Sequence, residues 1–255
     1  MIVLAGFSAL AQAVQWKRAR QIRQLLAGPN LVVQSTDFEG AITAPEIDLC
    51  IVPCDWVRVA YEEDAQTLRG RIRVWPCGVD ETYWSCKKRP KGTRHALVYW
   101  KNAPQELCLG AERLLKELRW EPIRITYGCY NSGQYKEALT QSTFAVFLSQ
   151  SESQGIALAE AWAMDVPTLV WNPRELTYNG RRYSTVSACP YLSDATGAEW
   201  VALDQLAQLV KSFSVQGARF EPRSWVLNNM TDTVAAANML HIVNEASPSA
   251  RRIWG

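Results

Sequence analysis

The chain has 255 residues, of which 48% are hydrophobic and 20% are charged. This composition supplies enough apolar surface for one large or two small folded domains and excludes an intrinsically disordered chain. The formal net charge of +2 at pH 7 is too small for the basic surface of a dedicated nucleic-acid-binding protein, so no nucleic-acid partner is expected.

The N-terminus is apolar but lacks the features of an export signal. No positive charge precedes the run from Met1 to Val14, and Lys17, Arg18 and Arg20 follow it, which is the reverse of the order in a signal peptide. No stretch approaches the roughly 20 apolar residues that a membrane-spanning helix needs. We therefore expect a soluble, cytoplasmic protein, and contact with the inner face of the membrane stays open.

The seven cysteines and two histidines form no pattern typical of a metal site or a disulfide framework. The number of cysteines is odd, and no CxxC spacing is repeated. We expect reduced thiols that serve as small apolar core residues, and no bound metal.

In the first third of the chain, apolar runs of strand length alternate with amphipathic helical stretches. This order is typical of a parallel sheet with crossover helices. The expected strands are Ile2 to Ala5, Leu31 to Gln34, Ile47 to Pro53 and Arg71 to Trp75. The expected helices are Leu10 to Leu26 and Trp56 to Leu68, with a return at Gly28-Pro29-Asn30 after the first of them.

A polar, lysine-rich segment from Glu81 to Thr93 has no hydrophobic period and is the best candidate for a linker. A second alternating series follows it, with expected strands His95 to Trp100, Pro122 to Thr126, Phe144 to Leu148 and Pro167 to Trp171. Its expected helices are Pro104 to Leu118, Gly133 to Thr140, Gly155 to Met164, Leu203 to Phe213 and Thr231 to Asn244. The two series predict an α/β fold with two Rossmann-like domains, residues 1–80 and 81–255, each a parallel sheet with flanking helices.

The segment from Phe144 to Trp171 carries the strongest chemical signal. It reads as strand, polar loop, helix and strand, which puts the loop at the carboxyl end of a parallel strand, where open α/β sheets bind ligands. Ser153 and Gln154 are polar loop residues, and Gly155 lets a ligand approach the backbone closely. The helix start has unpaired amides, those of Gly155, Ile156 and Ala157, and they would suit a diphosphate.

Two glutamates accompany this helix start. Glu152 lies in the loop, and Glu160 lies about a turn and a half into the helix, so both can face one site. Carboxylate oxygens accept hydrogen bonds from sugar and ribose hydroxyls. The pair therefore favours a polyol diphosphate over a bare phosphate.

This segment resembles the second domain of retaining GT-B-fold glycosyltransferases of the group 1 type. The matching residues are Ser151-Glu152, Gly155-Ile156, Glu160-Ala161 and Val166-Pro167. The resemblance implies that Glu152 contacts the donor sugar and that Glu160 binds the nucleotide ribose. At Asp165 the family commonly has a glycine that closes the helix, and Asp tolerates the left-handed conformation better than most residues.

The resemblance extends upstream, where Asp48 to Pro53 and Arg71 to Asp80 are similar to the end of the family's first domain. Lys101 holds a position comparable to that of the family's diphosphate-binding cation, although Glu106 replaces a second cation that the family often has. An ordinary exposed lysine at a strand end is the open alternative. The family's first domain is usually longer than residues 1–80, so the acceptor half is expected to be abridged.

The loop from Tyr127 to Gly133 corresponds to the loop that holds the nucleotide base in this family. Gly128 and Tyr130 are the candidate base contacts, and a plain strand-to-helix turn is the alternative. Near the N-terminus, the basic residues Lys17, Arg18, Arg20 and Arg23 could bind an anionic acceptor or an acidic lipid surface, or form an ordinary solvated helix face.

The resemblance implies a glycosyltransferase that moves a sugar from a UDP- or GDP-sugar to an unknown acceptor, with retention and without a metal or other cofactor. Lys101 and the helix-start amides would stabilise the departing diphosphate. One alternative is a non-catalytic nucleotide-sugar-binding protein or a partner subunit of a glycosyltransferase. Another is a sugar-nucleotide epimerase, which usually relies on additional acidic and histidine residues that this chain hardly supplies.

Overall fold

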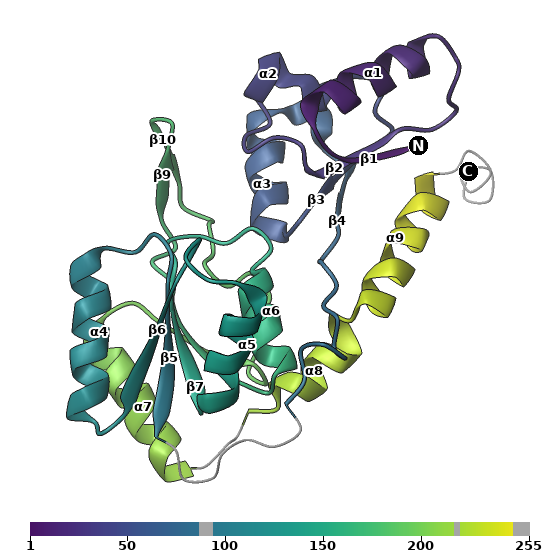
Figure 1. Cartoon of the computed structure of the whole chain (residues 1–255). Coiled ribbons are helices and arrows are strands. Elements are labelled where there is room, and N and C mark those ends of the chain that lie inside the picture. The colour runs from purple at the N-terminus through teal and green to yellow at the C-terminus, as the bar shows by residue number, and fades with distance from the viewer. Residues whose placement is uncertain (87–93, 217–219, 247–255) are drawn as a thin grey trace. The chain divides into compact units, whose positions relative to one another are not determined.

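The computed structural model describes residues 1–86, 94–216 and 220–246, and these residues form two compact units (Figure 1). Unit 1 comprises Met1–Cys77 together with Thr233–Gly255, and unit 2 comprises Gly78–Asp232. Both units are α/β structures with a parallel sheet flanked by helices, which confirms the predicted fold class.

Unit 1 contains a four-stranded parallel sheet in the order β1-β2-β3-β4. Its strands are β1 (Ile2–Ala5), β2 (Leu26–Asn30), β3 (Leu49–Val52) and β4 (Ile72–Val74). The connecting helices are α1 (Phe7–Arg18), α2 (Asp37–Gly40) and α3 (Asp55–Asp64), with the 3-10 turns Ala41–Thr43 and Gln66–Leu68.

The second strand of unit 1 does not lie where the sequence predicted it. The strand expected at Leu31 to Gln34 is β2, which begins at Leu26, and the helix expected to reach Leu26 ends at Arg18. The Gly28-Pro29-Asn30 sequence, interpreted as a return before the strand, lies inside β2. Gly28 has φ 120°, and a Cβ atom on it would stand 1.9 Å from the Ile51 carbonyl oxygen, so the close approach of β2 to β3 requires glycine.

Helix α9 (Asp232–Ala246) covers one face of the unit 1 sheet. The indole N–H of Trp75, just after β4, donates a hydrogen bond of 2.8 Å to the Ala235 carbonyl oxygen. The apolar cluster between α9 and the sheet consists of Leu26, Leu49, Ile51, Trp75, Met239, Ile242, Val243 and Ala246. This burial ties the C-terminal helix to the N-terminal strands.

Unit 2 contains a five-stranded parallel sheet in the order β11-β8-β7-β5-β6. Its strands are β5 (His95–Trp100), β6 (Glu121–Thr126), β7 (Phe144–Leu148), β8 (Thr168–Trp171) and β11 (Gly197–Trp200). All five residues of β7 are buried, as expected for a central parallel strand covered on both faces. Four of the five strands lie within one residue of their predicted bounds, and β11 was not predicted.

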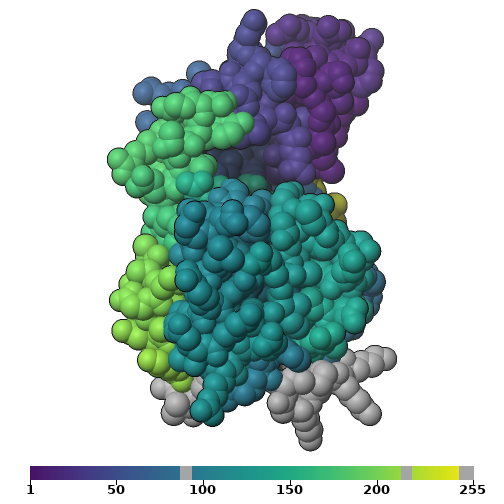
Figure 2. All heavy atoms as spheres, turned by 60° about the vertical axis from the view of Figure 1, so that its left-hand side comes forward, coloured from purple at the N-terminus to yellow at the C-terminus, as the bar shows by residue number. Residues whose placement is uncertain are grey.

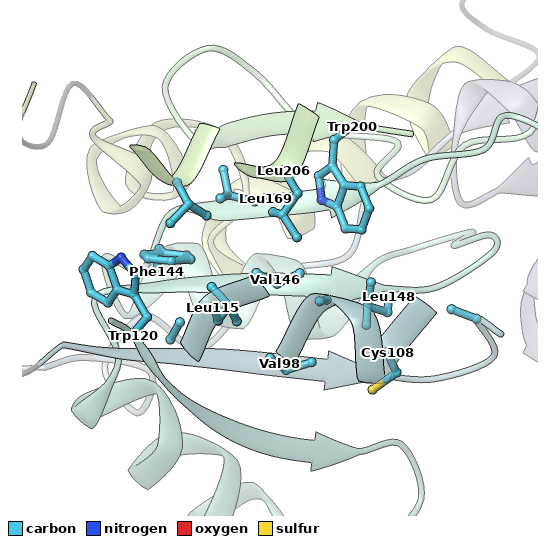
Figure 3. Packing of buried hydrophobic residues seen from close by; sticks show 14 residues of the cluster. Val98, Cys108, Leu115, Trp120, Phe144, Val146, Leu148, Leu169, Trp200 and Leu206 are labelled. Atoms are coloured by element: carbon cyan, nitrogen blue, oxygen red, sulfur yellow. The ribbon is translucent and has the colours of Figure 1, made fainter. Parts of the chain in front are cut away.

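The helices of unit 2 are α4 (Gln105–Glu117), α5 (Ser132–Gln141), α6 (Ile156–Ala163), α7 (Leu203–Gln216) and α8 (Pro222–Asn229). Helices α4 and α7 pack together over one face of the sheet. Figure 3 shows the core beneath them, in which Cys108 and Leu115 of α4 and Leu206 of α7 meet Val98, Val146 and Leu169 of the strands. This core fixes the strands whose carboxyl ends carry the candidate site.

A separate antiparallel hairpin follows β8, formed by β9 (Leu176–Tyr178) and β10 (Arg181–Tyr183). Figures 1 and 2 show it as a projection from unit 2. The buried Asn172 holds its base, because the side-chain oxygen accepts from the Ala188 amide at 3.0 Å and the amide group donates to Glu199 at 2.7 Å. The hairpin was not predicted from the sequence.

Of the predicted linker, residues 87–93 lie outside the described part of the chain. Before them, the Asp80 carboxylate accepts hydrogen bonds of 2.9 Å from the amides of Thr82 and Tyr83, which forms a turn. All seven cysteines lie in the described residues and carry free thiols there. In the same residues, no helix combines the length and the apolar character that a membrane crossing requires.

Candidate functional site

The unit 2 sheet has a topological switch point between β5 and β7. The chain leaves β5 through α4 towards β6, whereas it leaves β7 through α6 towards β8 on the other side. Loops at the carboxyl ends of two such strands diverge, and ligands of open α/β sheets bind there. Lys101 follows β5 and Glu152 lies in the loop after β7, so both belong to this edge.

Lys101 and Glu152 form an ion pair across the switch point. The Lys101 ammonium nitrogen lies 3.0 Å from both carboxylate oxygens of Glu152. The two side chains are 25% and 14% exposed, so the pair is partly shielded from water. The structure thus brings together the two residues that the sequence predicted to be catalytic, although they lie 51 positions apart in the chain.

Hydrogen bonds between the loops fix the positions of this pair. The Ser149 hydroxyl, which is 1% exposed, lies 2.9 Å from Glu152 Oε1. The side-chain oxygen of Asn102 accepts from the Gln150 amide at 2.7 Å. The Glu152 amide donates to the Ser187 carbonyl oxygen at 2.9 Å. The ends of β5 and β7 are therefore joined, and the base of the hairpin is joined to the Glu152 loop.

Gly155 ends the loop and begins helix α6. It has φ 66° and ψ 42°, a left-handed conformation in which a Cβ atom would approach Leu158 Cδ1 to 3.2 Å. The helix starts at Ile156, within one residue of its predicted start. Ile156 and Ala157, whose amides were predicted to bind a diphosphate, form its first turn. Amide groups at a helix start carry positive partial charge, which favours an anion. Of the other two predicted loop residues, Ser153 is exposed and Gln154 is half-buried.

Glu160 is half-buried on α6, and burial raises the pKa of its carboxyl group to about 7. Its charge acts on Tyr130 and Tyr135, whose pKa values are raised chiefly by burial and further by Glu160 and Glu152. The Tyr135 hydroxyl donates to the Ala157 carbonyl oxygen at 2.7 Å, which puts this tyrosine against the first turn of α6. Within the described residues, no hydrogen-bond donor contacts the Glu160 carboxylate.

The loop after β6 completes this edge of the sheet. The Tyr127 ring is 56% exposed, and the Lys101 ammonium lies 4.7 Å from its centroid, in a cation–π arrangement. Gly128 has φ 80°, and a Cβ atom there would meet no other atom within 4 Å. The hydroxyls of Tyr130 and Tyr99 lie 3.1 Å apart, which anchors the predicted base-binding loop to β5.

Sequence reasoning did not single out Ser149, Asn102 and Tyr99 as site residues, and it named Tyr127 only as the start of the predicted base-binding loop. Each of them lies within two residues of the end of a strand, and only the fold shows which of these residues meet. No group of three or more His, Cys, Asp or Glu side chains in the described residues is arranged to hold a metal ion.

The basic residues near the N-terminus form a second candidate surface, on unit 1. Lys17 pairs with Asp48 at 2.6 Å, and Arg18 pairs with Glu46 at 2.6 Å. Arg20 and Arg23 follow the helix and are exposed. Two of the four cations are thus neutralised within the unit, which leaves less charge for an anionic surface than the sequence suggests.

No protein-family model matches the sequence, and none of the curated proteins is significantly similar to it. Solved structures do match. The structure "lipopolysaccharide outer core galactosyltransferase WaaB apo form" superposes with a TM-score of 0.62 at 10% identity, over 96% of this chain and 74% of WaaB. TarM superposes with a TM-score of 0.63 at 14% identity, over 95% of this chain and 54% of TarM.

Sucrose-phosphate synthase from Thermosynechococcus elongatus superposes with a TM-score of 0.61 at 14% identity, over 96% of this chain and 73% of the synthase. These neighbours are GT-B glycosyltransferases, whose fold consists of two Rossmann-like domains. The chain therefore has the GT-B fold.

Proposed function

We propose that this protein is a glycosyltransferase that moves a sugar from a UDP- or GDP-sugar to an acceptor, with retention and without a metal. The observation that carries the proposal is the Lys101–Glu152 ion pair at the switch point of a GT-B-fold sheet, with Glu152 in the loop that leads into the helix with Glu160. A cation, two carboxylates and a helix start at one edge suit the diphosphate, sugar and ribose of one donor.

In this proposal, each group acts on a different part of the donor. When the bond from the sugar to the diphosphate breaks, negative charge grows on the diphosphate, and Lys101 and the amides of Ile156 and Ala157 stabilise it. Glu152 accepts hydrogen bonds from sugar hydroxyls and orients the reacting carbon. The acceptor oxygen then forms its bond on the face that the diphosphate leaves, which is what retention requires, and an oxygen of the departing diphosphate takes the acceptor's proton.

Glu160 suits the ribose because its carboxylate lacks donors in the described residues and is half-buried. Removing a carboxylate from water is unfavourable unless hydrogen bonds replace the lost solvation. The two ribose hydroxyls would supply them. The Tyr130 ring packs against Tyr135, whose hydroxyl is hydrogen-bonded to Ala157 of the same helix.

The test combines donor binding with donor turnover. Wild-type protein is titrated with UDP, GDP and their glucose and galactose conjugates, and the release of nucleoside diphosphate is then followed with the conjugate that binds. We expect Lys101→Met to weaken donor binding and to abolish release. The matched control is Glu112→Gln. Glu112 accepts a hydrogen bond of 2.6 Å from Arg124 at a place remote from the switch point, so this variant should keep donor binding and release. If no nucleotide or nucleotide sugar binds the wild type, the proposal is wrong.

A non-catalytic partner subunit is the second candidate. The observation that favours it is the match to the structure "Crystal structure of GtfA/B complex", which superposes with a TM-score of 0.55 at 13% identity, over 93% of this chain and 60% of that chain. A partner subunit would bind the nucleotide sugar but would release no nucleoside diphosphate, whether water or a simple sugar is the acceptor. Binding together with release identifies the enzyme.

A further inference from the structure

The Lys101–Glu152 pair conflicts with the two tasks proposed for its members. The Lys101 ammonium donates to both Glu152 oxygens at 3.0 Å. The same ammonium is needed for the diphosphate, and the same carboxylate is needed for the sugar hydroxyls. While the pair is intact, two of the three N–H donors of Lys101 face Glu152, and the carboxylate offsets the positive charge that the diphosphate would use.

Each member of the pair also has support that does not depend on the other member. The Lys101 ammonium lies 4.7 Å from the centroid of the Tyr127 ring, and this contact persists if the carboxylate leaves. The Ser149 hydroxyl reaches Glu152 Oε1 and the Ser151 carbonyl oxygen at 2.9 Å, and Asn102 Oδ1 at 3.3 Å. A hydroxyl has one proton, so Ser149 can keep or release Glu152 without losing its own hydrogen bond.

We propose that Glu152 is an internal competitor of the donor diphosphate for Lys101, an inference that rests on the proposed function. Before the donor binds, the Glu152 carboxylate is paired with the Lys101 ammonium. A diphosphate carries more negative charge than one carboxylate and displaces it, which frees Glu152 for the sugar hydroxyls. Tyr127 and Ser149 are positioning residues, Tyr127 for Lys101 and Ser149 for Glu152.

This competition would make the site favour a complete donor over its product. With a nucleotide sugar, the displaced carboxylate gains hydroxyl donors from the sugar. With a nucleoside diphosphate alone, it is left partly buried without those donors, which is unfavourable. After transfer, Glu152 would therefore return to Lys101 and promote release of the diphosphate.

The experiment is a binding titration of Glu152→Gln with UDP and UDP-glucose, or with the GDP pair if the wild type binds GDP more tightly. Glutamine keeps the shape and removes the competing charge. We expect UDP to bind roughly two- to fivefold more tightly than to the wild type, the factor that corresponds to an ion pair of this exposure. UDP-glucose should gain less or lose affinity, because the sugar contact is weakened. Glu112→Gln, which removes the carboxylate of the Arg124 pair, should leave both affinities unchanged.

Two results separate this inference from simpler explanations. In a Lys101→Met background, the gain from Glu152→Gln should vanish, and a gain that persists would show plain repulsion between Glu152 and the phosphates. A Glu152→Gln variant that binds UDP no more tightly than the wild type overturns the inference and leaves the proposed function standing. A wild type that binds no nucleotide overturns both.

Discussion

At the scale of single residues, burial has more effect on the pKa of Glu160 than any charged neighbour has. Its pKa is raised to about 7 by loss of solvation, whereas the pKa of Glu245 is lowered, chiefly by its hydrogen bond with Arg73. A carboxyl group that titrates near neutral pH makes both stability and ligand binding depend on pH in the range where the protein is handled.

We predict that Glu160→Gln changes the pH dependence of stability. In the folded protein the carboxyl group keeps its proton up to about pH 7, whereas in the unfolded chain it loses the proton near pH 4.5. The folded state therefore binds more protons between these values, and stability falls as pH rises through that window. The variant has no carboxyl group here and lacks this loss. The difference in free energy of unfolding, variant minus wild type, should therefore be up to about 3 kcal/mol larger at pH 8 than at pH 4.

Urea unfolding at pH 4 and pH 8 measures this effect. Glu245→Gln is a control for which the change in stability should have the opposite sign. The pKa of Glu245 is lowered in the wild type, so its ionised carboxylate stabilises the fold. That variant should lose stability at pH 8. Parallel pH profiles for Glu160→Gln and the wild type would show that Glu160 is not buried as described.

The same titration predicts that nucleotide affinity rises with pH. Glu160 can accept hydrogen bonds from ribose hydroxyls with both oxygens only when it is ionised. Affinity of the wild type should therefore increase between pH 6 and pH 8, and the affinity of Glu160→Gln should be flat over this range apart from ionisation of the nucleotide phosphate. Calorimetric titrations at pH 6, 7 and 8 measure both proteins. An equal increase in nucleotide affinity in the two proteins would show that Glu160 does not contact the nucleotide.

At the scale of secondary-structure elements, the sequence predicted the elements that have a hydrophobic period and missed the short polar ones. The run Phe144 to Leu148 is apolar throughout and was assigned correctly as a buried strand. Strands β9, β10 and β11 have three or four residues with polar and apolar side chains mixed, so no period identifies them. Strand β11 depends on a tertiary partner, with Thr168 opposite Gly197. Strands β9 and β10 pair with each other across the local turn Asn179-Gly180, whose positive φ values of 49° and 75° suit a two-residue hairpin.

We predict that Gly197→Ala strongly destabilises unit 2. A Cβ atom at this position would lie 1.9 Å from the Thr168 carbonyl oxygen, so β11 could not stay paired with β8. The loss should be about 2 to 4 kcal/mol, as for other substitutions that force the backbone apart. Gly180→Ala in the hairpin is the control, since a Cβ there meets nothing within 4 Å and only the left-handed conformation costs about 1 kcal/mol. Equal losses in urea unfolding would contradict the close packing of β11.

The candidate site was predictable where adjacent chain segments form it and not where distant ones meet. Glu152, Gly155 and Glu160 belong to one strand, loop and helix, whose order the sequence shows. Lys101 was identified by its resemblance to a family position, and its contact with Glu152 could not be read from a separation of 51 residues. Tyr127 contacts Lys101 only because β6 and β5 are neighbours in the sheet.

At the scale of the whole molecule, unit 1 is assembled from the two ends of the chain. Alternation along the sequence could predict its helices and strands but not that α9 would cover a sheet built from the first 77 residues. Such a return depends on long-range apolar packing, for which a single sequence carries no local signal.

We predict that Ile242→Asp unfolds unit 1 locally while leaving unit 2 folded. Ile242 is 5% exposed among the apolar residues beneath α9, and a buried carboxylate without a partner is highly unfavourable there. Amide hydrogen exchange should become faster in β2 and β3 and stay slow in β5 and β7. Leu240→Asp, at a residue of α9 that is 65% exposed, is the control and should change neither. Faster exchange throughout both units would mean that they unfold as one.

The most direct test of the account is amide hydrogen exchange of the wild type with and without a nucleotide sugar that it binds. The proposed site consists of the loops after β5, β6 and β7, so exchange at short times should slow within residues 101–103, 127–131 and 150–157. Protection limited to those three segments would place the donor at the switch point of the unit 2 sheet. Protection confined to α1 and the residues after it, with these loops unchanged, would contradict the central claim that Lys101, Glu152 and Glu160 bind the donor.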